Sequence, residues 1–247
     1  MSTLFLWQSK KGPIRIFSAI IILTFSIQAR AQLRDAVNLA DHDDKFYHLG
    51  IALIYNNSHF QVTPHPNLLL SDSVLSVNPE NTGGFGLAGM HTFNINKHLE
   101  FRVVFPELMF SYKNLTYHTT FPAGQDTTAT KQIESILLGF PVQVKFLSDR
   151  MNNFRFYVLG GINYQYDLAS NATARKATDL VKLNPIDLSV EAGIGFQFFF
   201  PVFILSPEIK ISNGIINTHH RDPNLIYSST IDKLKSRMIV FSLIFEG

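Results

Sequence analysis

From Lys45 onward, polar and apolar residues alternate with a period of two in about eight separate stretches. The clearest stretch runs from 187 to 200. Its apolar positions are Leu188, Val190, Ala192, Ile194, Phe196 and Phe198, and between them lie Asp187, Ser189, Glu191, Gly193, Gly195 and Gln197. A β-strand with these two faces would separate lipid from water.

The alternation predicts eight strands, at 46–55, 84–93, 99–112, 135–146, 154–166, 187–200, 202–212 and 237–245. Most of them exceed the usual strand length of about 5 to 6 residues and approach the roughly 9 to 11 of a tilted membrane strand. In the third strand the apolar face changes after Pro106. Because proline cannot donate to a β-ladder, we expect a bulge there.

The connections between these strands alternate strictly between long and short. In chain order they are 56–83, 94–98, 113–131, 147–153, 167–185, 201 and 213–236. An outer-membrane barrel has short periplasmic turns and long outer loops, whereas a soluble β-sandwich has no reason to alternate in this way. The sequence therefore predicts an all-β fold, an eight-stranded antiparallel transmembrane outer-membrane β-barrel.

Aromatic residues stand at both ends of two predicted apolar faces. Tyr47 and Tyr55 bound the first strand, and Phe154 and Tyr166 bound the fifth. A phenol ring suits a site with one dry and one wet side, so we expect these four residues in the aromatic girdles at the lipid headgroups.

The first 31 residues have the pattern of a secretory signal peptide. Lys10, Lys11 and Arg15 precede an apolar run at 16–27, and Ala29 and Ala31 supply small residues for cleavage after Ala31. An uncleaved anchor is the alternative, but the run is shorter than the roughly 20 residues needed to span a bilayer. We predict a signal peptide at 1–31, a short periplasmic segment at 32–45 and the barrel at 46–247.

The composition and charge of the chain exclude several classes of site and ligand. The chain has no cysteine, which excludes disulfides, thiolate sites and a lipoprotein anchor. Four of the 21 basic residues and no acidic residue lie in the signal peptide, so 17 basic and 19 acidic residues remain, a net charge of −2. Nothing here points to nucleic acid, a small-molecule substrate or a cofactor.

The residues that face inward decide whether the barrel could conduct. An eight-stranded barrel is just wide enough to be filled by side chains. The charged residues predicted to face the lumen are Glu100, Arg102, Glu134, Lys145, Arg155, Asp187, Glu191, Glu208 and Lys210. Acids and bases are nearly balanced, so we predict a paired network that plugs the lumen; a selective pore, the alternative, would need an excess of one sign.

The sequence offers only weak candidates for catalytic or metal-binding residues. Tyr117, His118, Thr119 and Thr120 lie in one outer loop, and His219 and His220 in another, but neither spacing indicates a catalytic arrangement. The polar run Asp41, His42, Asp43 and Asp44 is read as a solvated linker rather than a metal site. We predict no catalytic, metal-binding or cofactor-binding residue.

Several short motifs, in order and spacing, resemble the PorT family of outer-membrane barrels from Bacteroidetes, called SprT in gliding bacteria. They lie at 45–50 (KFYHLG), 150–157 (RMNNFRFY), 167–170 (DLAS), 191–195 (EAGIG), 207–210 (PEIK) and 236–237 (SR), and the similarity spans nearly all the chain after residue 31. The resemblance implies a non-enzymatic role in protein export by the type IX secretion system, and in gliding motility where the organism glides. The partners would be outer-membrane lipid and other envelope or secretion-system proteins.

One feature departs from the expected pattern. The chain ends Phe245-Glu246-Gly247 rather than on an aromatic residue, so the C-terminal insertion signal is imperfect, with Phe245 as its anchor. Two other functions stay open: a structural or adhesive barrel without a secretory role, and a barrel enzyme that modifies lipid A.

Overall fold

A computed structural model of the chain describes residues 37–66, 68, 74–120, 126–170, 181–222 and 225–247. These residues belong to one compact unit, Val37–Gly247. The signal peptide predicted at 1–31 lies outside the described residues. No helix within the described ranges is long and apolar enough to cross a membrane.

The secondary structure is almost entirely β. In chain order the elements are the 3-10 helix η2 (Ala40–Asp44), β1 (Tyr47–Pro64), β2 (Val74–Glu80), β3 (Thr82–Asn96), β4 (Leu99–Thr120), β5 (Asp126–Leu147), β6 (Phe154–Asp167), β7 (Ile186–Phe199), β8 (Ile204–Gly214), the short helix α2 (Ile226–Ser229) and β9 (Ile231–Glu246).

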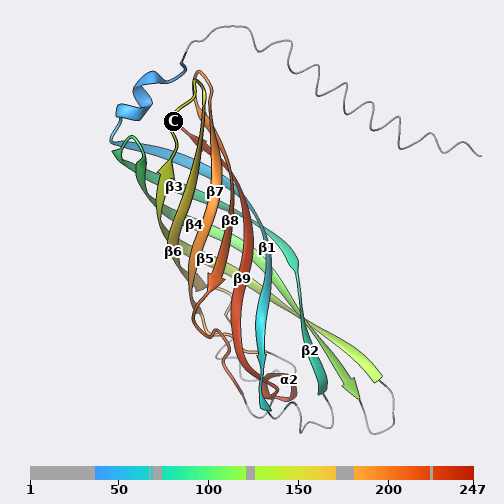
Figure 1. Ribbon diagram of the computed structural model, residues 1–247. Helices are drawn as coiled ribbons and strands as arrows, with labels where there is room; N and C mark the ends of the chain where they lie inside the picture. Colours follow the sequence, from blue (N-terminus) through green and yellow to red (C-terminus); the bar gives the residue numbers. More distant parts are fainter. Residues whose placement is uncertain (1–36, 67, 69–73, 121–125, 171–180, 223–224) are drawn as a thin grey trace, which may run out of the picture. The chain divides into compact units, whose positions relative to one another are not determined.

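One antiparallel sheet contains all of these strands, in the order β2-β4-β3-β1-β9-β8-β7-β6-β5. β4 also pairs with β5, from Leu99 opposite Phe146 to Thr120 opposite Asp126. This pairing joins the two sides of the sheet, so β1 and β3 to β9 form a ring in which each strand has two neighbours (Figure 1). Closure matters in lipid, where no water is present to satisfy an open strand edge.

The predicted antiparallel all-β fold is confirmed, and all eight predicted strands are present in the ring. A ninth strand, β2, was not predicted. It precedes β3 in the chain, separated from it by one residue, and pairs with the outer part of β4, from Glu80 opposite Asn114 to Val74 opposite Thr119. The predicted connections 56–83 and 113–131 are therefore largely strand. Their polar residues concealed the alternation, because Leu115 and Tyr117 are buried between threonine, asparagine and histidine neighbours.

The predicted bulge at Pro106 is confirmed. The register of β4 against β5 shifts between Val103 and Glu107, and the register against β3 shifts between Ala88 and Met90. Before the bulge the even-numbered residues of β4 face inward, and after it the odd-numbered residues do. Glu107 consequently faces the lumen.

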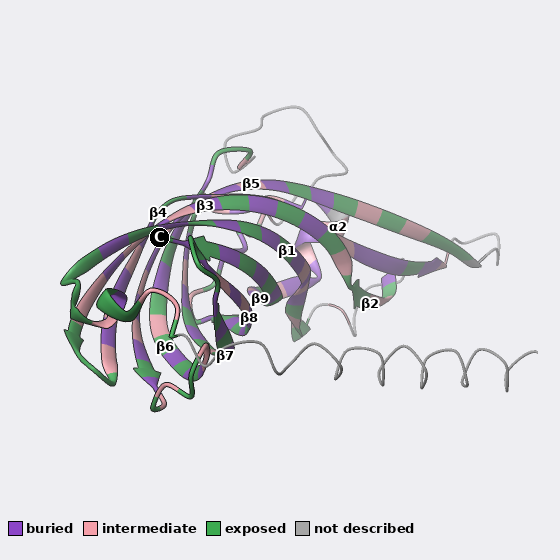
Figure 2. Cartoon of the chain, turned by 90° about the horizontal axis from the view of Figure 1, so that it is seen from above, coloured by how far each residue is buried: buried purple, intermediate pink, exposed green. Residues whose placement is uncertain are grey.

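Burial alternates residue by residue along the ring (Figure 2). On β1, Leu49 and Ile51 are 52% and 64% exposed on the outer face, whereas His48 and Ala52 are buried inside. Large apolar residues occupy the outer face of every ring strand, as a surface in contact with lipid tails requires.

The two ends of the ring differ. Turns at 97–98, 148–153 and 200–203 lie at the end that holds the C-terminus, the end that faces the periplasm in outer-membrane barrels. At the opposite end, β1, β2, β4 and β5 continue past the ring, and the described residues of the longer connections after β6 and β8 lie there, at 168–170, 181–185, 215–222 and 225–230. The predicted alternation holds, but strand extensions rather than loops account for much of it.

Two adjacent glycines on β6 give a test of the close packing inside the ring. A Cβ on Gly161 would lie 2.9 Å from the Cα of Gln143 and meet the Val142 carbonyl, whereas a Cβ on Gly160 would have its nearest atom at 3.9 Å. Gly161→Ala should therefore lower the free energy of unfolding by about 1–3 kcal/mol through overpacking. Gly160→Ala, the matched control, should change it little.

Urea unfolding of the refolded barrel in lipid vesicles measures both variants. Equal stabilities for the two would contradict the inward packing of Gly161.

Candidate functional site: a closed lumen

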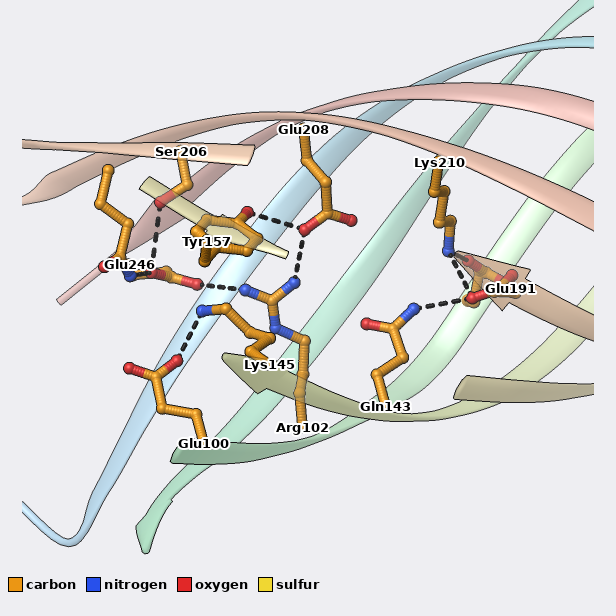
Figure 3. A network of polar contacts seen from close by, with 12 residues as sticks. Glu100, Arg102, Gln143, Lys145, Tyr157, Glu191, Ser206, Glu208, Lys210 and Glu246 are labelled. Carbon is orange, nitrogen blue, oxygen red and sulfur yellow. Dashed lines mark hydrogen bonds and ion pairs between the residues drawn. The ribbon is translucent and has the colours of Figure 1, made fainter. Parts of the chain in front are cut away.

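Toward its periplasmic end, the lumen holds an ion-pair network built from strands on opposite sides of the ring (Figure 3). Arg102 on β4 donates from Nη1 to Glu208 Oε2 at 2.8 Å and from Nη2 to Glu246 Oε1 at 3.0 Å. The Tyr157 hydroxyl donates to the same Glu208 oxygen at 2.7 Å. These contacts connect β4, β6, β8 and β9 across the interior, with the Arg102 side chain fully buried.

Lys145 completes this first cluster. Its Nζ lies 2.5 Å from Glu100 Oε2 and 4.3 Å from the centroid of the Tyr157 ring. Glu246 also accepts hydrogen bonds from Gln197 at 3.2 Å and from Ser206 at 3.3 Å. Each charge is paired and hydrogen-bonded, which is the condition under which buried ions are tolerated.

A second cluster lies further along the lumen, around Lys210. Its Nζ lies 3.1 Å from Glu191 Oε2 and 3.5 Å from Glu107 Oε1. Asn163 donates to both carboxylates, at 3.0 Å to Glu107 and 3.1 Å to Glu191, and Gln143 donates to Glu191 at 2.7 Å. The second cluster thus ties β4, β5, β6, β7 and β8 together.

An apolar cluster fills another part of the interior. Its members come from β1, β3, β4, β5 and β9: Ala52, Ile54, Ala88, Met90, Val104, Met109, Leu137, Met238, Val240 and Ile244. The lumen is therefore closed by apolar packing as well as by ion pairs, as expected for a barrel of eight strands.

The outer end of the barrel is covered by a second apolar cluster, the outer cap. It contains Phe60, Val74, Leu115, Tyr117, Ile133, Val181, Leu183, Ile231 and Leu234. The Tyr117 and Tyr227 rings lie 4.7 Å apart, and burial raises the pKa of the Tyr117 phenol. The extended strands β1, β2, β4, β5 and β9 supply most of this cap, so the strands that project past the ring also close it.

The periplasmic end is covered by η2, which was predicted to be part of a solvated linker. That prediction is wrong for this segment. Asp43 pairs with Arg155 at 2.9 Å, and Arg150 donates to the backbone carbonyls of Asn38 and Leu39. Its His42 side chain is buried, because η2 lies against β1 and against the β6 and β7 side of the mouth. We call Val37–Asp44 the mouth segment.

Most of the residues predicted to face the lumen do so. Glu100, Arg102, Lys145, Glu191, Glu208 and Lys210 belong to the two clusters. Arg155 lies at the mouth with Asp43, and Asp187 lies at the outer end, where it accepts a hydrogen bond from Ser236. The clusters hold five carboxylates and three cations, so acids exceed bases by two.

The prediction that Glu134 faces the lumen is wrong. Its side chain is exposed on the outer face of β5, because it has the same parity as Ile136 and Leu138, while Ser135 faces inward. The alternation in the sequence already contained this information.

Sequence reasoning missed Glu107 and Glu246. Glu107 faces inward only because of the bulge at Pro106. The change of the apolar face after Pro106 in the sequence already indicated that odd-numbered residues face inward from there on. Glu246 alternates with the outward residues Phe245 and Leu243, so it faces inward and binds Arg102. The unusual C-terminus is thus part of the lumen network.

The residues predicted for the aromatic girdles lie on the outer wall. Tyr47, Tyr55 and Tyr166 are 41%, 52% and 41% exposed, and the Phe154 ring contacts those of Phe196 and Phe198. β1 continues nine residues beyond Tyr55, so this tyrosine lies in the middle of its strand.

The histidines considered for catalysis are not arranged for it. His118 is exposed and lies 3.5 Å from the Thr128 hydroxyl, and His220 is exposed. His219 Nε2 lies 3.0 Å from Ser228 Oγ, but both side chains are buried, and burial lowers the pKa of His219. Among the described residues no carboxylate accepts a hydrogen bond from the His219 ring, and no group of three or more acidic or histidine side chains is placed to hold a metal ion.

Comparisons with known proteins agree with this architecture. The family model described as "Outer membrane protein beta-barrel domain" matches residues 31–220. A comparison with curated protein sequences finds no match.

Three solved structures are similar in fold. OprG from Pseudomonas aeruginosa is 13% identical, with 81% of this chain and 94% of OprG covered and a TM-score of 0.47. Neisserial surface protein A is 11% identical, with 79% and 95% covered and a TM-score of 0.38. Ail of Yersinia pestis, in complex with a heparin analogue, is 10% identical, with 82% and 100% covered and a TM-score of 0.38. Similarity at these levels does not extend to function.

Removing Arg102 should be costly. Arg102→Met keeps much of the side-chain volume but leaves Glu208 and Glu246 without their buried cation, so we expect a loss of about 3–5 kcal/mol in the free energy of unfolding. Lys233→Met is the control, because Lys233 is 56% exposed and its pair with Asp232 is 3.9 Å long. Urea unfolding should show almost no change for the control; a similar small change for Arg102→Met would contradict the network.

The closed lumen also predicts electrical silence. Purified full-length barrel in planar bilayers should give no large, steady single-channel currents, because side chains fill the interior. A conducting porin added to the same bilayer checks that the recording works. Steady currents from this protein would contradict a plugged lumen.

Proposed function

We propose that this chain, which belongs to the outer membrane protein beta-barrel domain family and lies in the outer membrane, supports protein export by the type IX secretion system as a closed, non-enzymatic barrel. Where the organism glides, the same role extends to gliding motility. The barrel contacts membrane lipid through its apolar outer wall, and it acts on export by contact with other envelope proteins.

The closed lumen is the observation that carries this proposal. Ion pairs fill the centre, the outer cap covers one end and the mouth segment covers the other. A barrel closed in three places is poorly suited to passing solutes or cargo. Its contribution to export therefore comes from its surfaces.

The positions of the motifs that resemble the PorT family support the specific assignment. Glu191, Glu208 and Lys210, from two of the motifs, belong to the lumen clusters. Arg150 and Arg155, from a third motif, bind the mouth segment. The motifs thus include residues that close this barrel, beside exposed positions of the outer wall such as Leu49 and Ile194.

The projecting strands offer a contact surface outside the membrane. β2, β4 and β5 pair beyond the ring, with one face on the outer cap. The other face is polar, and its rows pair Asn78 with Thr116 and Thr130, and Ser76 with His118 and Thr128. A flat polar face of this kind suits reversible protein contacts, which are no more apolar than the rest of a protein surface.

Deletion of the gene in its native host tests the proposal. Surface display of cargo with a C-terminal sorting domain should be lost in the deletion strain and restored by the wild-type gene. A variant with His118→Glu and Thr128→Glu, both at exposed positions, should restore the barrel to the membrane but restore display only in part. A charge change at exposed Lys233, Lys233→Glu, is the matched control and should restore display fully.

Unchanged display in the deletion strain would overturn the export role and favour a structural or adhesive barrel. Mass spectra of lipid A from the deletion strain and a His118→Ala strain should equal those of the wild type; a difference that follows His118 would favour a lipid-modifying enzyme instead.

A further inference from the structure

Two histidines meet where the mouth segment enters the barrel. The rings of His42 on η2 and His48 on β1 have centroids 4.5 Å apart, and each side chain is only 2% exposed. All four ring nitrogens are buried without a hydrogen-bond partner among the described residues. Buried polar groups are normally paired, so this pair needs an explanation beyond packing.

The mouth segment joins opposite sides of the ring. It continues directly into β1, and it is also bound to the β6 side, which lies four places round the ring from β1. Asn38 donates to Asn153 Oδ1 at 2.8 Å and to the Phe199 carbonyl at 2.9 Å, and Asp43 pairs with Arg155. The His42 ring lies 6.1 Å from that of Phe199. His42 therefore lies between β1 and β7 where the segment crosses the mouth.

Charged groups from every neighbouring element surround the two rings. They are Asp43 on η2, Glu100 and Arg102 on β4, Lys145 on β5, Arg150 in the following turn, Arg155 on β6 and Glu246 on β9. Glu100 is bound to Lys145, Glu246 to Arg102, and Asp43 to Arg155. Each of these carboxylates is already bound to a cation, and an imidazolium at His42 would have to be buried away from water, which is costly for a charge.

We propose that the His42–His48 pair is a pH-sensitive latch: η2 lies across the periplasmic mouth while His42 is neutral, and protonation of His42 releases the mouth segment. The proposal does not depend on the export role, since it concerns the barrel alone.

The direction of the pH effect follows from the docked state. Burial, and the neighbouring His48, lower the pKa of His42 from 6.5 to about 4 while η2 is docked. In the released segment the imidazole returns to its ordinary pKa near 6.5. Docking is thus at full strength above pH 6.5, weakens as the pH falls below it, and reaches its minimum below about pH 4. Between about pH 7.5 and about pH 5, the docking equilibrium should shift roughly 30-fold toward release from His42 alone.

Hydrogen–deuterium exchange of the full-length barrel in lipid nanodiscs measures this equilibrium. The amides of His42 and Lys45 are hydrogen-bonded to Leu39 and His42 carbonyls, and the amide of Asn38 to Asn153, so they report on docking. After correction for the intrinsic exchange rate at each pH, their protection should fall roughly 30-fold between about pH 7.5 and about pH 5. The lumen carboxylates are the same in the wild type and in the His42 variants, so the difference between these proteins isolates the contribution of His42.

His42→Phe removes the titrating group and keeps a ring in the site, so its protection should stay constant over the same range. If that variant is unprotected at every pH, His42→Asn takes its place with the same expectation. His220→Phe is the matched control, because His220 is exposed at the far end, and it should retain the wild-type pH dependence.

Two results would overturn the proposal. One is wild-type protection that stays constant between the two pH values. The other is protection that falls equally in wild type, His42→Phe and His42→Asn, because the responsible group would then lie elsewhere.

Discussion

A strand edge left open in lipid has no water to satisfy its backbone groups, and the pairing of β4 with β5 removes that edge. Closure with only eight strands then makes the interior narrow. Every second residue of a ring strand faces that interior, so each of these side chains has to pack against or pair with another. The ion pairs of Arg102, Lys145 and Lys210, and the apolar cluster beside them, are two ways of meeting this one requirement.

The same constraint connects the centre of the barrel with its ends. Arg102 binds the last strand through Glu246, and Glu246 lies close to the histidines at the mouth. At the other end, β4 and β5 run past the ring and bring Leu115, Tyr117 and Ile133 into the outer cap. The lumen network, the mouth segment and the cap are therefore built from the same few strands, and a change in one is expected to affect the others.

This arrangement favours a role through surfaces over a role through transport. The interior is occupied by residues that hold the wall together, and the histidines at the outer end, His118 and His219, lack a catalytic arrangement. The surfaces of the barrel that lie outside the membrane are the polar face of the projecting strands and, in the periplasm, the mouth segment. The proposed contact with other envelope proteins and the proposed control of the mouth both place the function on these surfaces.

The sequence by itself determined the eight ring strands, the two faces of each strand, the bulge at Pro106 and six members of the lumen clusters, because a period of two depends only on local backbone geometry. It also contained the inward parity of Glu246 and the outward parity of Glu134. Only the tertiary structure decided which charges pair, because Arg102 meets Glu208 and Glu246 across 106 and 144 positions of the chain. The ninth strand and the docked η2 were likewise decided by tertiary contacts, since β2 pairs with β4 and η2 contacts β6 and β7, all of them distant in sequence.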